Sequence, residues 1–196
     1  MPLVTHDPYF SIWSPADKLT DADTVHWTGK PHRLTSLVRI DGKPFRVMGK
    51  EPADAPALPQ TNLEVLPTRT IYTFEGAGVR LTLTFMTPAL PEEIKLLSSP
   101  TTYLTYDIQS ASKNSHEVQI WFEASGEIAV NNASELANAS RFRSERGHSG
   151  KSCAPQRNPC LKRRAMICGL IGDSSGLSPR QTTEFQAELF SAETHD

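Results

Sequence analysis

The residues best suited to binding a ligand gather near the start of the chain, in the stretch HDPYFSIWSPADKLTDADTVHWTGKPH from His6 to His32. This stretch contains three histidines, two tryptophans, a tyrosine, a phenylalanine and four aspartates. Imidazoles and carboxylates bind metal ions or transfer protons, and indole rings stack on flat ligands. The stretch therefore predicts either a ligand site or a packing surface.

Five residues of this stretch are candidate binding residues: His6, Asp7, Trp13, His26 and Trp27. The two indoles have the shape to stack on a sugar ring. They are equally suited to anchoring the segment to its own domain or to a neighbouring one, which is a common use of tryptophan. We therefore favour packing over ligand binding for this set.

Two sets of residues in the same stretch have the chemistry of metal ligands. Asp17, Asp21 and Asp23 offer carboxylates for calcium, but their spacing is not that of an EF-hand loop. The histidines at positions 6, 26 and 32 have no regular spacing. We expect no metal and no cofactor here.

Motifs for catalysis are also missing from the sequence. It contains no GxSxG elbow, no HExxH helix and no phosphate-binding glycine loop. The acidic residues on or beside the predicted strands, which are Asp107, Glu117, Glu123 and Glu127, show no pairing that would support acid–base work. The sequence therefore predicts no catalytic residue.

Alternating apolar and polar residues predict a series of strands after residue 33. The clearest case is VRLTLTFM, residues 79–86, and similar patterns occupy residues 68–74, 102–109 and 118–124. Residues 34–49 read as a hairpin around Asp41-Gly42, because a type I′ turn needs positive φ at both central residues. GEIAVN, residues 126–131, suggests one more short strand.

These elements predict a mainly β protein with an antiparallel β-sandwich-like domain. An irregular, aromatic-rich N-terminal segment precedes it, and alternation stops near residue 135, which predicts an unstructured C-terminal tail. The expected organisation is an N-terminal segment with a hairpin (1–60), the start of the sandwich domain (61–134) and the tail (135–196).

Composition excludes several partners. The net charge is −2 and the pI is about 6.3, so the overall charge of the chain does not attract nucleic acid or an anionic membrane. The basic LKRR cluster in the tail has few neighbouring aromatic residues, and no apolar run approaches the roughly 18 residues of a membrane span. No signal peptide is visible, and Cys153, Cys160 and Cys168 form no CxxC pair.

Four stretches together resemble the N-terminal part of the glutaminase A family. They are PLVTHDPYFSIWS, HWTGKPHRLTSLVRIDGKPFRVMG, QTNLEVLPTRTIYTFEGAGVRLTLTFMTP and EVQIWFEASGEIAVN, and the resemblance runs from about Pro2 to about Asn132. It implies a large, secreted or periplasmic type of protein that hydrolyses L-glutamine to L-glutamate and ammonia. It also implies that a C-terminal helical catalytic domain, the expected partner of this region, follows the β region.

The tail departs from that resemblance. The family's stretch similar to EQPVLxKKGDDLRIDWG is absent, yet the codons for residues 164–173, read one frame over, permit GDDLRIDWG at every junction. Met166 into Ile167, for example, must then read GAT, which encodes Asp. We therefore expect a shift of reading frame between about Ala133 and Ser149.

The sequence thus favours an N-terminal fragment of a glutaminase A-like hydrolase that is inactive alone. A carbohydrate- or protein-binding β-sandwich that uses Trp13 and Trp27 is the alternative hypothesis. A third hypothesis makes the basic tail a nucleic-acid contact, with binding that salt would weaken.

Overall fold

The computed structural model describes residues 1–130, 135–143, 149–155, 163–167, 172–177 and 182–193. In residues 1–130 the elements are β1 (Pro2–Thr5), β2 (Ser11–Trp13), β3 (Leu34–Ile40), β4 (Lys43–Met48), β5 (Gln60–Leu66), β6 (Arg69–Gly76), β7 (Val79–Met86), α1 (Ile94–Leu97), β8 (Thr101–Ser110), β9 (His116–Ala124) and η1 (Gly126–Ala129). The later segments form β10 (Ala137–Arg143), β11 (Ser149–Pro155), β12 (Arg163–Ile167), β13 (Gly172–Leu177) and β14 (Thr182–Glu193).

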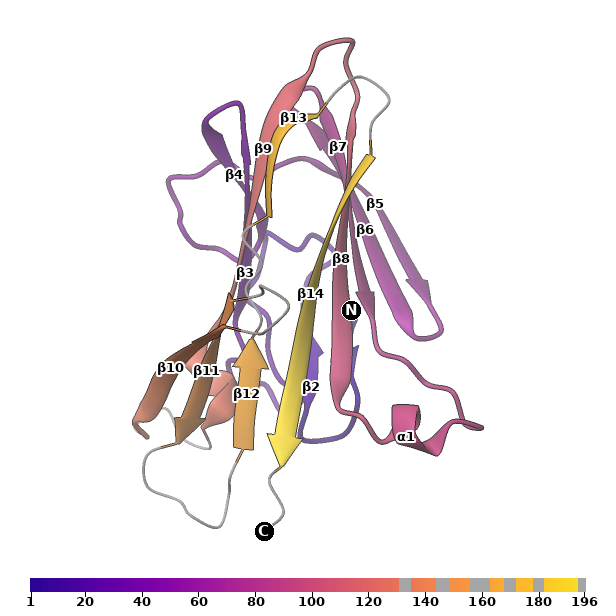
Figure 1. The fold of residues 1–196 in the computed structure, drawn as a ribbon, viewed down its shortest axis with the longest axis vertical. Coiled ribbons are helices and arrows are strands. Elements are labelled where there is room, and N and C mark those ends of the chain that lie inside the picture. Colours follow the sequence, from indigo (N-terminus) through magenta and orange to yellow (C-terminus); the bar gives the residue numbers. More distant parts are fainter. Residues whose placement is uncertain (131–134, 144–148, 156–162, 168–171, 178–181, 194–196) are drawn as a thin grey trace.

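The strands form two large antiparallel sheets that face each other (Figure 1). One sheet has the strand order β10-β11-β12-β14-β8-β7-β6-β5, and the other has the order β13-β9-β3-β4. β1 and β2 pair separately near the N-terminus. The expected mainly β, antiparallel architecture is confirmed. No helix in the described parts of the chain is long and apolar enough to cross a membrane.

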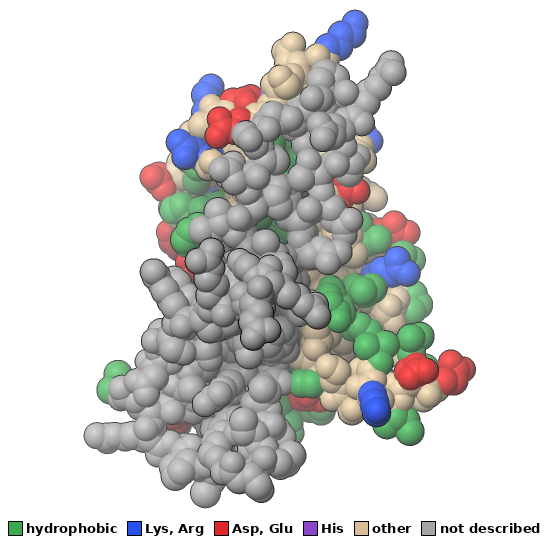
Figure 2. All heavy atoms as spheres, in the orientation of Figure 1, with side chains coloured by type: hydrophobic (Ala, Val, Ile, Leu, Met, Phe, Trp, Pro, Cys, Tyr) green, Lys and Arg blue, Asp and Glu red, His purple; other side chains and the backbone are tan. Residues whose placement is uncertain are grey.

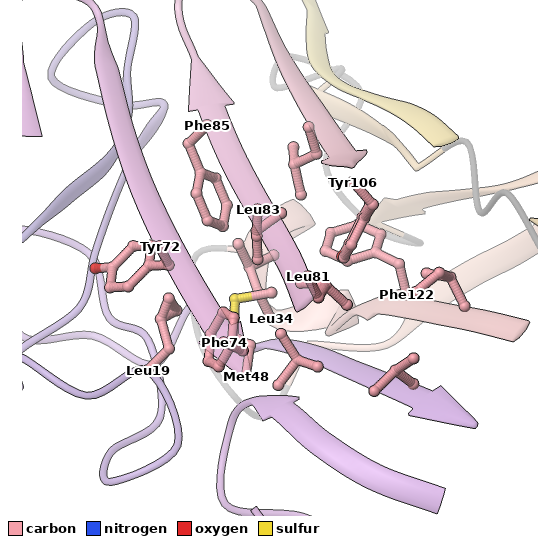
Figure 3. Packing of buried hydrophobic residues seen from close by; sticks show 14 of the residues in the cluster. Leu19, Leu34, Met48, Tyr72, Phe74, Leu81, Leu83, Phe85, Tyr106 and Phe122 are labelled. Atoms are coloured by element: carbon pink, nitrogen blue, oxygen red, sulfur yellow. The ribbon is translucent and has the colours of Figure 1, made fainter. Parts of the chain in front are cut away.

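Apolar and polar residues alternate along the strands, so the apolar side chains of both sheets face each other and form the core. In β7 the apolar positions Val79, Leu81, Leu83 and Phe85 are buried, while the polar positions between them are not. Figure 3 shows Leu81, Leu83 and Phe85 grouped with side chains of β3, β4, β6, β8 and β9. Each such side chain contributes about 1.5–3 kcal/mol when fully buried, so this cluster holds the two sheets together.

Two tight turns join consecutive strands, and the first of them is the turn that the sequence predicts. Asp41 and Gly42 join β3 to β4 with φ of 48° and 81°, which suits a type I′ turn. Ala77 and Gly78 join β6 to β7 with φ of 50° and 77°. These turns set the register of both hairpins and bring their ends to the edge of the sandwich.

The N-terminal segment is more regular than predicted and packs against the sandwich. Besides β1 and β2, Val25 makes isolated bridges to Trp13 and Pro31. Its buried apolar side chains are Leu3, Val4, Phe10, Ile12 and Leu19, and all belong to the main core cluster. The segment therefore lies on the domain and does not trail free.

Two local predictions differ from the structure. Residues 126–129 form the 3₁₀ helix η1 and not a strand, because Ser125 Oγ accepts the Glu127 N–H and begins a helical turn. β5 was not expected, since its burial pattern shows no buried face that alternation could reveal.

The tail differs from the unstructured chain that the sequence predicts. The structure assigns strands β10–β14 to its described parts, and β14 pairs with β8 from Thr182↔Gln109 to Phe190↔Thr101. β8 would otherwise present a row of unpaired backbone groups, which readily accepts another strand. Such pairing uses the backbone, so it does not require alternating side chains. Cys160 and Cys168 lie outside the described residues.

Candidate functional site

The loop after β1 and the loop after Val25 meet at one backbone carbonyl. The Pro8 carbonyl oxygen accepts hydrogen bonds from His26 Nε2 (2.9 Å) and from Trp27 Nε1 (2.7 Å). Since a carbonyl only accepts, His26 carries a proton on Nε2, and its Nδ1 accepts from Thr28 Oγ1 (2.7 Å). This shared bond fixes the orientation of both rings.

Asp7 shapes the loop that presents this carbonyl. Its Oδ1 accepts the backbone N–H groups of Tyr9 (2.7 Å) and Phe10 (2.8 Å), which is the hydrogen bonding of an Asx turn. Its Oδ2 lies 3.8 Å from His6 Nε2. Asp7 therefore has a clear role in building the loop.

The surface of this region carries two exposed aromatic rings. Trp27 is 62% exposed and Tyr9 is 69% exposed, whereas His26 is buried, with its ring centroid 5.5 Å from that of Trp27. We call Tyr9 and Trp27 the aromatic surface. Trp13 is half-buried, and its Nε1 donates to Ser11 Oγ (2.6 Å). Trp13 is thus partly packed against the domain, whereas most of Trp27 is exposed, and the preference for packing over ligand binding stays a prediction for this set.

The candidate metal ligands do not form a metal site. His26 and His32 are close, with ring centroids 4.9 Å apart. Within the described part of the chain, however, no group of three His, Cys, Asp or Glu side chains is arranged to hold a metal ion.

Exposed apolar side chains also gather around α1. Leu90, Ile94 and Leu97 are 50%, 75% and 43% exposed, and Figure 2 shows hydrophobic side chains on the surface at the lower right, where Figure 1 places α1. The sandwich therefore has a second apolar surface, formed by this short helix and the loop before it.

A second polar constellation joins the β3–β4 turn to the loop between β8 and β9. His116, at the start of β9, contacts Asp41 Oδ2 through Nδ1 (2.7 Å) and Ser112 Oγ through Nε2 (2.7 Å). Asp41 Oδ1 also accepts the Glu117 N–H (2.9 Å). The His116 side chain and the Glu117 N–H both favour the charged carboxylate, so they hold the pKa of Asp41 below its usual range. The arrangement is that of a nucleophile, a base and an orienting acid.

Sequence reasoning missed this serine–histidine–aspartate set because no motif marks it. Ser112 and His116 share one loop, but Asp41 lies 75 residues before His116. Only the pairing of β3 with β9, which sets Ile40 opposite Val118, brings Asp41 beside the histidine. The sequence therefore contains no signal for this set, and the absence of a catalytic residue stays a prediction.

Glu127 forms an ion pair with Arg33 that no sequence pattern indicates. Arg33 Nε donates to Glu127 Oε2 (2.9 Å), and a second guanidinium nitrogen donates to Oε1 (2.6 Å). These hydrogen bonds from Arg33 lower the pKa of Glu127 and raise that of Arg33. The pair joins the start of β3 to η1, so its role is structural.

Comparison with known proteins divides the chain into two matched regions. Residues 1–59 match a family described as a domain of unknown function, DUF4964, and residues 68–164 match another, DUF5127. The second match continues beyond residue 135, where the sequence predicts a boundary.

A curated relative supplies a more specific link. The chain is 26% identical over 145 residues to glutaminase A of Aspergillus oryzae, and this match covers 70% of the chain. The chain spans only about a fifth (21%) of the length of that relative. The match agrees with the resemblance carried by the four sequence stretches, and the chain is accordingly a distant relative of glutaminase A.

Proposed function

We propose that this chain is the N-terminal, non-catalytic β region of a glutaminase A-like hydrolase. In this proposal the activity of the whole protein is hydrolysis of L-glutamine to L-glutamate and ammonia, and a C-terminal helical domain performs it. The relationship to glutaminase A and the small share of that relative which the chain spans support this division of labour. The β region then serves as a rigid base for the catalytic domain.

The observation that carries the proposal is that the indole of Trp27 is both fixed by a hydrogen bond and exposed. Its N–H already has a partner in the Pro8 carbonyl, yet 62% of its side chain is exposed. Another domain can pack against the exposed face of this ring at little cost, because the side chain is already ordered and its N–H keeps its hydrogen bond. Covering it contributes on the order of 2 kcal/mol of apolar burial, which suits contact with another domain. The apolar side chains around α1 offer a second such contact.

The direct test is ammonia release from L-glutamine by the purified chain, with glutaminase A of Aspergillus oryzae assayed beside it. We expect no release above buffer, because the β region is proposed to hold none of the groups that act on glutamine. Turnover that co-purifies with the chain and disappears on substitution of a residue in 1–130 would contradict the proposal.

A carbohydrate-binding module remains the second candidate, and the same indole favours it. An exposed, fixed tryptophan face is a stacking platform for a sugar ring. Titration of the chain with oligosaccharides while Trp27 fluorescence is recorded separates the two functions. Saturable binding that Trp27→Ala abolishes supports the module, and its absence supports the interdomain role.

A further inference from the structure

We propose that Ser112 is an activated nucleophile, with His116 as its general base and Asp41 as the group that orients His116. The expected substrates are small activated acyl compounds, such as aryl esters. This activity is separate from glutamine hydrolysis and does not depend on the relationship to glutaminase A. It rests on the contacts of the three side chains and of the loops that hold them.

The hydrogen bonds determine where the proton on the imidazole lies. Asp41 Oδ2 is 2.7 Å from His116 Nδ1, and a carboxylate can only accept, so the neutral ring carries its proton on Nδ1. Nε2 then presents a lone pair to Ser112 Oγ at 2.7 Å. The hydroxyl therefore donates to Nε2, which is the state that a general base requires.

A second contact leaves the serine oxygen able to attack. The Asn114 N–H donates to Ser112 Oγ (3.1 Å) and occupies one of its lone pairs. The Asn114 carbonyl competes for the hydroxyl proton, but at 3.5 Å it is a much weaker acceptor than Nε2 at 2.7 Å. One lone pair of the oxygen remains for a substrate.

The surroundings hold the base and leave the nucleophile accessible. His116 is buried, with 9% of its surface exposed, whereas Ser112 is half-buried on the loop between β8 and β9. Gly78 lies against the imidazole: a Cβ there would be 2.6 Å from Nε2 and 2.7 Å from Cε1. The β6–β7 turn therefore restricts the ring, while part of the surface of Ser112 is exposed.

The proposed reaction balances with water as the second substrate. Ser112 Oγ bonds to the carbonyl carbon of the ester while its proton moves to His116 Nε2, and the carbon–oxygen bond to the leaving group breaks. The leaving group takes that proton from Nε2, so the imidazole is again able to accept a proton when water enters. Water then attacks the acyl-serine, its proton passes through Nε2 to Ser112 Oγ, and the carboxylic acid is released.

The same contacts would also fasten the β3–β4 turn to the β8–β9 loop without any chemistry, so the test must distinguish reactivity from stability. The purified chain is treated with diisopropyl fluorophosphate, which forms a stable adduct with activated serines, and the site is found by peptide mass spectrometry. Hydrolysis of p-nitrophenyl acetate is measured in parallel. The matched control is Ser115→Ala, which removes an exposed hydroxyl from the same loop.

We expect the adduct on Ser112, with loss of labelling and of ester hydrolysis in Ser112→Ala but not in Ser115→Ala. His116→Gln should slow labelling about 100-fold, as loss of a general base does. Asp41→Asn is the second variant, used if His116→Gln does not fold, because asparagine tolerates the left-handed backbone conformation of this turn position.

Labelling of Ser112 that is no faster than that of the urea-unfolded chain would overturn the proposal. Unchanged labelling rates in both folded variants would also overturn it. In those cases the three side chains act only as a structural link between loops.

Discussion

At the scale of single residues, the orientation of the aromatic surface depends on contacts that no sequence pattern reveals. The side chain of Asp7 bends the loop, and the Pro8 carbonyl then accepts both ring donors. The sequence identified the residue types that meet here, because aromatic residues and histidines are concentrated in one stretch. The sequence alone could not show which indole is exposed, because the exposure of each ring depends on the hydrogen-bond partner of its N–H in the folded chain.

The two N-terminal tryptophans should therefore respond differently to a quencher. In single-tryptophan variants, Trp27 should be quenched by acrylamide almost as strongly as free indole, and Trp13 clearly less, because Trp27 is 62% exposed and Trp13 is half-buried. Trp121, which is 44% exposed, should fall between them. Equal quenching of Trp13 and Trp27 would show that the loops do not pack as described.

The Arg33–Glu127 pair predicts a pH dependence of stability. The folded-state pKa of Glu127 is lowered, so its contribution is present above the unfolded pKa of about 4.3 and is lost as the pH falls through the folded value. Glu127→Gln should lower the free energy of unfolding by roughly 0.2–1 kcal/mol at pH 7, and this difference should shrink below about pH 4.

Urea unfolding between pH 3 and pH 7 measures this difference. Glu123→Gln, which alters an exposed acid on β9, serves as the control and should change stability little at any pH. A difference for Glu127→Gln that stays constant down to pH 3 would show that the ion pair does not form in solution.

At the scale of elements, the sequence was informative wherever one face of a strand is buried. Alternation predicted β6, β7, β8 and β9, and Asp41-Gly42 predicted the β3–β4 turn. β5 escaped prediction because it is an edge strand whose residues are mostly exposed. The serine–histidine–aspartate set escaped for a related reason, since it needs the pairing of strands that are far apart in the chain.

The two tight turns should differ in their tolerance of alanine. Gly42→Ala should cost about 1 kcal/mol, because φ at this position is 81° and no atom lies within 4 Å of the new Cβ. Gly78→Ala should cost more, since its positive φ is joined by a contact of 2.6 Å with His116. Gly126→Ala is the control, with open space and no positive φ.

Chemical denaturation of the three variants gives the comparison directly. The expected order of destabilisation is Gly78→Ala, then Gly42→Ala, then Gly126→Ala. Equal stability of the first two variants would mean that the β6–β7 turn does not press on the imidazole.

At the scale of the whole molecule, the origin of the tail decides how much of the chain belongs to the proposed β region. We predict that the nucleotide sequence across codons 130–196 contains an insertion or deletion relative to related genes, and that the restored frame encodes GDDLRIDWG. The reason is that each codon junction in residues 164–173 permits this reading. A sequence in which the shifted frame encodes other residues would contradict the prediction and leave β10–β14 as native strands.

The central claim is that this β region supports a separate glutaminase domain, and a chimera tests it most directly. The segment of Aspergillus oryzae glutaminase A that this chain matches is replaced by the matching residues of this chain, with or without Trp27→Ser. We predict that the chimera releases ammonia from L-glutamine while the isolated chain does not. We also predict that Trp27→Ser lowers the Tm of the chimera by several degrees more than that of the isolated chain, because only the chimera covers the indole. A folded chimera without activity, or an equal effect of Trp27→Ser in both proteins, would contradict the account.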